Sequence, residues 1–368
     1  MMDAVVAGHL CLDIIPDLTA LAPGQFDAAF QPGRLVQSGP AKLSTGGAVS
    51  NTGLALHLLG VKTRLIARVG DDQLGSTLRQ SINERGEGLA EGFIKSTESS
   101  TSYSIVISPP GSDRRFLHHP GANDDFSARD VSDEALQDAR LFHFGYPPLM
   151  ANMYSNGGRQ LLELFQRVKS HGLTTSLDMA YPDPESPAGR ADWHSILHNV
   201  LPYVDIFVPS LDEILYMLWR QTDVPPSAGL LTKVSRELLG MGAKMVLLKL
   251  GDRGLYLRTA REPILRGLGL AAPNDLHLWS DFEAWLPCFK VEVVGTTGSG
   301  DVTVAGFLAA LLRSLPPEEA LTTALAVGAC CVEAADALSG IRSWDGTWQR
   351  IRSGWGNNPE PEQFVRKH

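Results

Sequence analysis

Short apolar runs alternate with stretches of helical spacing along most of the chain. Runs long enough for buried strands occur at residues 4–14, 63–69, 139–145, 173–178 and 204–208. Apolar residues have helical spacing between the third and fourth runs, which predicts a strand–helix–strand unit with parallel strands. The regular alternation predicts an α/β fold, with one doubly wound, mostly parallel sheet flanked by helices.

Two further pairs of runs predict hairpins. Residues 101–107 and 114–119 flank a turn that contains two Pro residues and a Gly. Residues 244–257 have the pattern of strand, turn and strand, with Gly251 and Gly254 where the turn needs backbone freedom.

The most informative stretch joins a glycine-rich turn to a helix near residue 300. The sequence Thr-Thr-Gly-Ser-Gly-Asp at 296–301 follows an apolar run at 291–294, which we expect to end a strand, and helical spacing begins at Val302. The first N–H groups of a helix have no internal partner, so such a junction suits an anion such as phosphate. The negative charge of Asp301 would repel phosphate, so its presence here indicates a function. The function that fits is to take a proton from an attacking hydroxyl.

Other interpretations of this stretch are weaker or carry no function. A P-loop needs Lys after its last Gly, where this chain has Asp301. The interpretation without function is a helix that starts after a glycine turn, with Asp301 as an ordinary residue of its first turn.

Two polar features near the N-terminus are candidates for substrate binding. Asp13 closes the run at 4–14, and a carboxylate at the carboxyl end of a strand in an open α/β sheet lies where ligands bind. Gly46 and Gly47 precede a helix that carries Asn51, a donor and acceptor, on its first turn. The alternatives are an aspartate in an ordinary turn and a flexible entry into a helix.

Composition and charge narrow the class of protein. The chain has 368 residues and a net charge of −9, which argues against nucleic acid or an anionic membrane surface as a partner. Its four cysteines show no metal or disulfide spacing, which favours a reduced, cytoplasmic protein. Residues 1–12 are interpreted as a strand and not as a signal peptide, and no apolar run of about eighteen residues occurs in the sequence.

The motifs together resemble those of the ribokinase-like (PfkB) carbohydrate kinases, from about residue 4 to 340. The stretch at 296–301 is similar to the C-terminal signature of that family. The resemblance implies an ATP-dependent kinase in which Asp301 is the catalytic base. It also implies an anion hole formed by the N–H groups of Gly298, Ser299 and Gly300.

The resemblance extends to the other ligand sites. It implies that the sugar is bound by Asp13, Gly46, Gly47 and Asn51. It implies that the nucleotide is bound at Ser210, Lys249, Gly251, Gly254 and Thr297, and that Glu213 contacts Mg²⁺ through water. An alternative for Ser210 and Glu213 is a capping box at the start of a helix. Gly295 stands where the family commonly has an Asp that helps to bind a monovalent cation, which makes activation by potassium doubtful.

The family also implies a domain organisation. We expect a kinase domain at 1–340, with small β-lid segments at about 31–43 and 98–120 and a possible insertion at 259–287, followed by a C-terminal helix and tail at 341–368. The expected partners are ATP, a small sugar or nucleoside substrate and, in a possible homodimer, a second copy of the chain. Two alternatives stay open: a catalytically silent sugar- or nucleotide-binding protein on the same fold, and a nucleoside kinase of the family.

Overall fold

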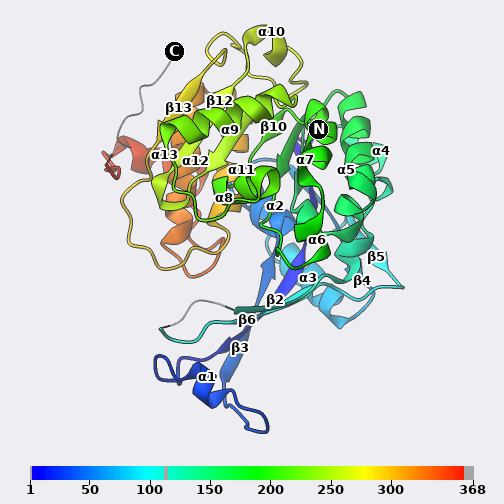
Figure 1. Cartoon of the computed structure of the whole chain (residues 1–368), viewed down its shortest axis with the longest axis vertical. Helices are drawn as coiled ribbons and strands as arrows, with labels where there is room; N and C mark the ends of the chain where they lie inside the picture. The colour runs from blue at the N-terminus through cyan, green and yellow to red at the C-terminus, as the bar shows by residue number, and fades with distance from the viewer. Residues whose placement is uncertain (1, 112–114, 360–368) are drawn as a thin grey trace.

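The computed structural model describes residues 2–111 and 115–359, and it contains two sheets (Figure 1). The main sheet has nine strands in the order β13-β12-β11-β10-β9-β8-β1-β4-β5. The strands are β1 (Ala4–Gly8), β4 (Thr63–Gly70), β5 (Phe93–Ser96), β8 (Leu141–Gly145), β9 (Thr174–Asp178), β10 (Ile206–Phe207), β11 (Met245–Lys249), β12 (Leu255–Thr259) and β13 (Glu283–Leu286). Neighbours from β5 to β11 are parallel, and β12 and β13 are antiparallel. The predicted mostly parallel sheet and the hairpin of β11 and β12 are confirmed.

Helices cover both faces of the main sheet, and each face has its own apolar core. Residues of β1 alternate between the faces, so Ala4 and Val6 lie in one core and Val5 and Ala7 in the other. The first core is covered by α2 (Ala48–Leu58), α3 (Gln73–Asn83), α11 (Ser299–Leu312), α12 (Pro317–Val332) and α13 (Trp344–Arg352). The second is covered by α4 (Asp133–Leu136), α5 (Ala151–Ser170), α7 (Trp193–Val200), α8 (Leu211–Trp219) and α9 (Ala228–Gly240). The short helices are α1 (Phe26–Ala29), α6 (Pro187–Arg190) and α10 (Glu262–Leu265).

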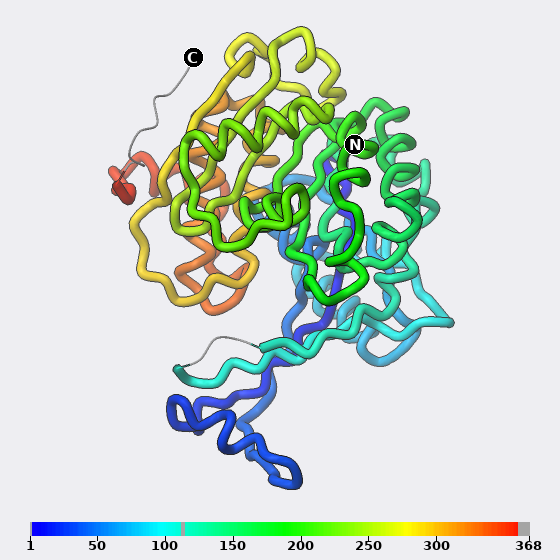
Figure 2. Tube along the Cα trace, viewed as in Figure 1, coloured from blue at the N-terminus to red at the C-terminus, as the bar shows by residue number. Residues whose placement is uncertain are grey.

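A second, four-stranded sheet contains parts of both segments that were expected to form a lid, and we call it the lid sheet. Its order is β3-β2-β6-β7, with bounds β2 (Cys11–Asp17), β3 (Gly39–Gly46), β6 (Tyr103–Ile107) and β7 (Arg115–His119). Figure 2 shows the blue N-terminal segment projecting from the body, with the cyan segment that contains β6 at its base. Residues 112–114 of the expected hairpin and 360–368 of the expected tail lie outside the described residues.

The expectation of one strand at 4–14 was wrong. The chain leaves the main sheet after Gly8, which has φ +130°, and enters the lid sheet at Cys11. The side chain of Asn123 bonds both backbone groups of Leu10 at the crossing, at 2.9 and 3.2 Å, so the break in the ladder leaves neither backbone group of Leu10 unpaired. Asp13 therefore lies inside lid strand β2 and not at the end of a main-sheet strand.

The expectation that residues 291–294 end a strand was also wrong. Val293 and Val294 are largely exposed, and the segment has no ladder partner among the described residues. It is held instead by its backbone, because the N–H groups of Val294 and Gly295 both donate to the carbonyl of Val332. The segment at 259–287 contributes β13 to the edge of the main sheet. In the part of the chain that the structure describes, no helix is long and apolar enough to cross a membrane.

A close approach between α2 and β8 generates a stability prediction. A methyl group on Gly145 would overlap the Cβ of Ala48, the first residue of α2. Gly145→Ala should therefore lower the free energy of unfolding by about 1–3 kcal/mol, because the buried overlap forces the backbone apart. Gly229 lies at an exposed position of α9, where a Cβ would meet none of the described atoms within 4 Å, so Gly229→Ala should instead raise the free energy of unfolding by about 0.5–1 kcal/mol. Urea unfolding measures both, and equal effects of the two substitutions would contradict the close approach.

Candidate active site

Asp301 lies in the first turn of a helix that is surrounded by protein. Helix α11 begins at Ser299, after Gly298 in the left-handed conformation at φ +71°, and every residue from Asp301 to Leu312 is buried. Such a helix is apolar on all sides and cannot lie at a surface. Asp301 itself is 2% exposed, so its carboxylate needs partners within the protein.

Three side chains from two other elements supply those partners. Asn51 Nδ2, on the first turn of α2, donates to Asp301 Oδ2 at 2.9 Å. The Tyr146 hydroxyl, just after β8, lies 2.7 Å from both carboxylate oxygens. The Thr52 hydroxyl lies 3.5 Å from Oδ1. Burial raises the pKa of Asp301, and the bond from Tyr146, the charge of Lys249 and the bond from Asn51 oppose that rise.

The predicted sugar-binding residues gather beside this carboxylate. A Cβ on Gly46 would lie 2.6 Å from Asp13 Oδ2, and a Cβ on Gly47 would lie 2.6 Å from His9 Nδ1. Glycine is required at position 47, where φ is +90° and a Cβ would also meet the backbone carbonyl of His9, whereas at position 46 a Cβ would displace the Asp13 side chain. Burial raises the pKa of Asp13. The fold thus brings Asp13, from the lid, to the helix entry that carries Asn51.

On the other side of Asp301 lies a buried ion pair. Lys249 ends β11 and Asp178 ends β9, and their side chains are 2.5 Å apart. The lysine lies over the start of α11, because a Cβ on Gly300 would be 3.9 Å from Nζ. Burial opposes the charge of Lys249, but the carboxylates of Asp178 and Glu213 outweigh it and raise the pKa of the lysine. Burial raises the pKa of Asp178 against the attraction of Lys249.

A cavity of about 470 Å³ opens next to the ion pair. Five predicted residues are among those that line it: Lys249, Gly251, Gly254, Ser299 and Gly300. Apolar side chains such as Leu255, Val291 and Leu325 supply other parts of its wall. A polar floor with apolar walls suits a ligand that has a phosphate end and a flat apolar ring.

Other predicted residues lie outside this lining. Thr297 and Ser210 do not line the cavity. Ser210 and Glu213 form the capping box of α8: Glu213 Oε2 accepts from the Ser210 N–H at 2.7 Å, and the Ser210 hydroxyl accepts from the Glu213 N–H at 3.3 Å. Glu213 nevertheless contributes to the electrostatics of Asp301 and Lys249.

Comparison with known proteins identifies the family. A model of the pfkB family of carbohydrate kinases matches residues 1–343. The chain belongs to the PfkB family. It is 23% identical over 343 residues to fructokinase-2 of Oryza sativa subsp. japonica, covering 91% of this chain and 89% of the relative. The predicted enzyme class, an ATP-dependent carbohydrate kinase, is confirmed.

Solved structures of PfkB-type kinases share the fold. Arabidopsis thaliana ribokinase complexed with ribose and ATP matches with a TM-score of 0.72 and 19% identity, over 96% of this chain and 99% of that one. A putative ribokinase II from E. coli, in complex with ATP and Mg²⁺, matches with a TM-score of 0.71 and 21% identity, over 96% of this chain and all of that one. At this identity the likeness establishes the ribokinase-like fold alone.

The donor set of this PfkB chain fits a magnesium ion that is shared with a nucleotide. Asp178 Oδ2 is buried and has no hydrogen-bond partner in the part of the chain that the structure describes, and the charge of Glu213 acts on this carboxylate. Within the described ranges no three His, Cys, Asp or Glu side chains gather as a metal site. Mg²⁺ commonly takes one or two carboxylates and completes its shell with water and phosphate oxygens.

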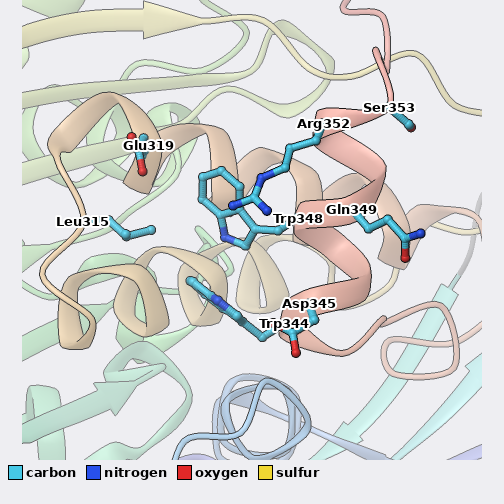
Figure 3. Close-up of a pocket in the computed structure, with 8 residues that line it drawn as sticks. All are labelled: Leu315, Glu319, Trp344, Asp345, Trp348, Gln349, Arg352 and Ser353. Carbon is cyan, nitrogen blue, oxygen red and sulfur yellow. The ribbon is translucent and has the colours of Figure 1, made fainter.

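Another hollow of this PfkB chain, of about 690 Å³, lies on α12 and α13. Figure 3 shows Trp344, Trp348 and Arg352 projecting from α13, with Glu319 on the facing helix. The guanidinium of Arg352 lies over the Trp348 ring. None of the predicted site residues lines this hollow, so the candidate active site is the one around Asp301.

Two residues in the PfkB site, His9 and Tyr146, were not predicted from the sequence. His9 follows β1 and is 2% exposed, and neither ring nitrogen has a hydrogen-bond partner among residues 2–111 and 115–359. Tyr146 follows β8, and its ring centroid is 6.1 Å from that of His9. The available signal was their position directly after a buried strand, because the carboxyl ends of parallel strands meet at one edge.

The buried ion pair generates a prediction about stability. Lys249→Met should lower the free energy of unfolding at pH 8 by about 3 kcal/mol, because it leaves the charge of Asp178 buried and unpaired. The raised pKa of Asp178 means that its ionised form is unfavourable in the fold, so the penalty should shrink as the pH falls towards about 5 and the carboxyl is protonated.

The matched control for this prediction is an exposed pair. Lys42→Met removes an ion pair to Asp336 of 3.1 Å, and it should change stability by less than about 0.5 kcal/mol. Denaturant unfolding of both variants at two pH values makes the measurement. A loss in Lys249→Met that is the same at pH 5 and pH 8 would show that Asp178 is not the source.

Proposed function

We propose that the chain transfers the γ-phosphoryl group of ATP to a hydroxyl of a sugar or sugar-like alcohol, with Asp301 as the general base. The observation that carries this proposal is the position of the Asp301 carboxylate. This buried carboxylate accepts a hydrogen bond from Asn51, one of the predicted sugar-binding residues. It also interacts electrostatically with Lys249, which lies near Gly300 at the cavity. A base needs this position, because it must reach a hydroxyl on one side while that oxygen faces a phosphate on the other.

The acceptor would lie on the Asp13 side. Asp13 and Asn51 offer the carboxylate and amide groups that bind sugar hydroxyls. The names of the fructokinase and ribokinase relatives indicate small sugars as their substrates. This supports a small polyol as the acceptor here, but it does not identify which one. The lid strands that carry Asp13 would exclude water, so that the phosphoryl group reaches the alcohol and not water.

The phosphate chain would lie over the first turn of α11. The N–H groups of Gly298, Ser299 and Gly300, at the start of α11, would donate hydrogen bonds to the phosphoryl oxygens as negative charge develops on them. The Ser299 N–H donates to the Thr296 carbonyl over 3.3 Å, which is long for a hydrogen bond. A phosphate oxygen at a shorter distance would therefore be a better acceptor for this N–H group. Lys249 would attract the phosphates while it remains paired with Asp178. Mg²⁺, held near Asp178 and Glu213, would neutralise phosphate charge when it is bound.

Removal of the base tests the proposal. Asp301→Asn should lower kcat by roughly a thousandfold, because general-base catalysis contributes on that scale. The dissociation constant for MgATP should change little, since the amide keeps a similar size and removes a charge that opposes phosphate. The measurement is ADP release from MgATP across neutral sugars, sugar acids and nucleosides, with ATP binding followed by calorimetry.

The matched control for this variant is Asp138→Asn. Asp138 is exposed shortly after α4 and does not line the cavity, so its variant should keep turnover. Full turnover in Asp301→Asn would remove Asp301 as the base. Binding of ATP or of a sugar without any turnover by the wild-type chain would favour the silent binding protein.

A further inference from the structure

Tyr146 combines two unusual features that the reaction scheme leaves unused. Its backbone has φ +71° and ψ +43°, the left-handed conformation that side chains disfavour. Its hydroxyl lies 2.7 Å from both oxygens of Asp301. Non-glycine residues keep this conformation only where the surroundings enforce it, and such residues cluster at functional sites.

The surroundings of Tyr146 hold it in place from both sides. Its N–H donates to the carbonyl of Asp178 at 3.2 Å, beside the end of β9. Pro147 and Pro148 follow directly, and their fixed φ values limit how the backbone can relax. Tyr146 is therefore held at the edge of the sheet where the parallel strands end, and its side chain points towards the first turn of α11.

We propose that Tyr146 is a positioning residue for the base: its hydroxyl orients the carboxylate of Asp301 and stabilises the ionised form. This inference rests on the proposed role of Asp301. The hydrogen bonds on the two oxygens are unequal. Oδ2 accepts from a second donor, Asn51, at 2.9 Å, whereas among the described residues Oδ1 has only the Thr52 hydroxyl, at 3.5 Å, besides Tyr146. Oδ1 is thus the oxygen with room for the proton of the acceptor.

Charged and titratable groups of neighbouring elements also act on this carboxylate. They are Lys249 from β11, Glu213 from α8, Asp178 from β9 and Cys331 from α12. On the Tyr146 side the neighbour is His9, whose pKa burial and then the nearby His118 lower to about 3, so it stays neutral at working pH. All of these groups are unchanged by a substitution at Tyr146, so a difference between variant and wild type reports the hydroxyl alone.

The first test is the pH profile of kcat/KM for Tyr146→Phe. Because the hydroxyl favours the charged form of Asp301, its loss should move the acid limb up by about one pH unit. The rate should then fall about tenfold on the acid limb and by less than about threefold on the alkaline plateau. A merely structural role would lower the rate equally at every pH. A higher rate in the variant would mean that Tyr146 blocks the acceptor, and either result overturns the proposal.

The matched control is Tyr256→Phe. Tyr256 is a fully buried tyrosine whose hydroxyl donates to the carboxylate of Glu283 at 2.7 Å, on strands β12 and β13. Its variant loses the same kind of bond elsewhere in the molecule. We expect a lower melting temperature for this control and an acid limb at the wild-type position.

A second measurement does not depend on turnover. With ¹³C-labelled aspartate carboxyls, the NMR signal that disappears in Asp301→Asn is that of Asp301, and its titration midpoint should be higher in Tyr146→Phe than in wild type. An unchanged midpoint overturns the inference even if the kinase is active. A raised midpoint in a chain that phosphorylates no sugar supports the pairing of Tyr146 with Asp301 and rejects the proposed function instead.

Discussion

On the proposed reaction, the arrangement of the site depends on one constraint, which is that the carboxylate of Asp301 has to remain charged inside the protein. An isolated buried carboxylate is so unfavourable that it would take up a proton. Here it is stabilised by the start of α11, by the Asn51 amide, by the Tyr146 hydroxyl and, at longer range, by Lys249. These groups come from α2, from the end of β8 and from β11, so the sheet and two helices must meet at one point.

That meeting explains several glycines, because it requires backbones to approach closely. Gly145 lets the first residue of α2 pack against the end of β8, and Gly47 lets the same helix start beside His9. At the start of α11 a Cβ on Gly298 would overlap Ala337, which follows α12. The glycines therefore set how near the donors of α2 and the first turn of α11 come to each other, and that distance determines whether Asn51 can reach Asp301.

What the sequence could predict was the part of the structure that local pattern determines. Parallel strands, the β11–β12 hairpin and the glycine-rich start of α11 follow from apolar spacing and glycine position, and they are present. The break at Gly8 was missed because both sides of it are apolar, so one run covers two sheets. The bond of Tyr146 to Asp301 was missed because it joins residues 155 positions apart, and the position of Tyr146 after a buried strand does not show which residue its hydroxyl contacts.

The charges of the site explain why, on the proposed reaction, phosphate has to be bound by backbone N–H groups that no side chain covers. Among the groups that the structure describes, the carboxylates of Asp301, Asp178 and Glu213 act on one another and share the charge of Lys249. One ammonium group does not balance three carboxylates, so on the proposed reaction the phosphates must be received by N–H groups and by a cation that arrives with them. N–H groups can act in this way only where no side chain covers them. Ser299 and Gly300 line the cavity, and Gly300 places no side chain over the first turn of α11, whereas Asp301, one residue later, turns its side chain into the protein towards Asn51.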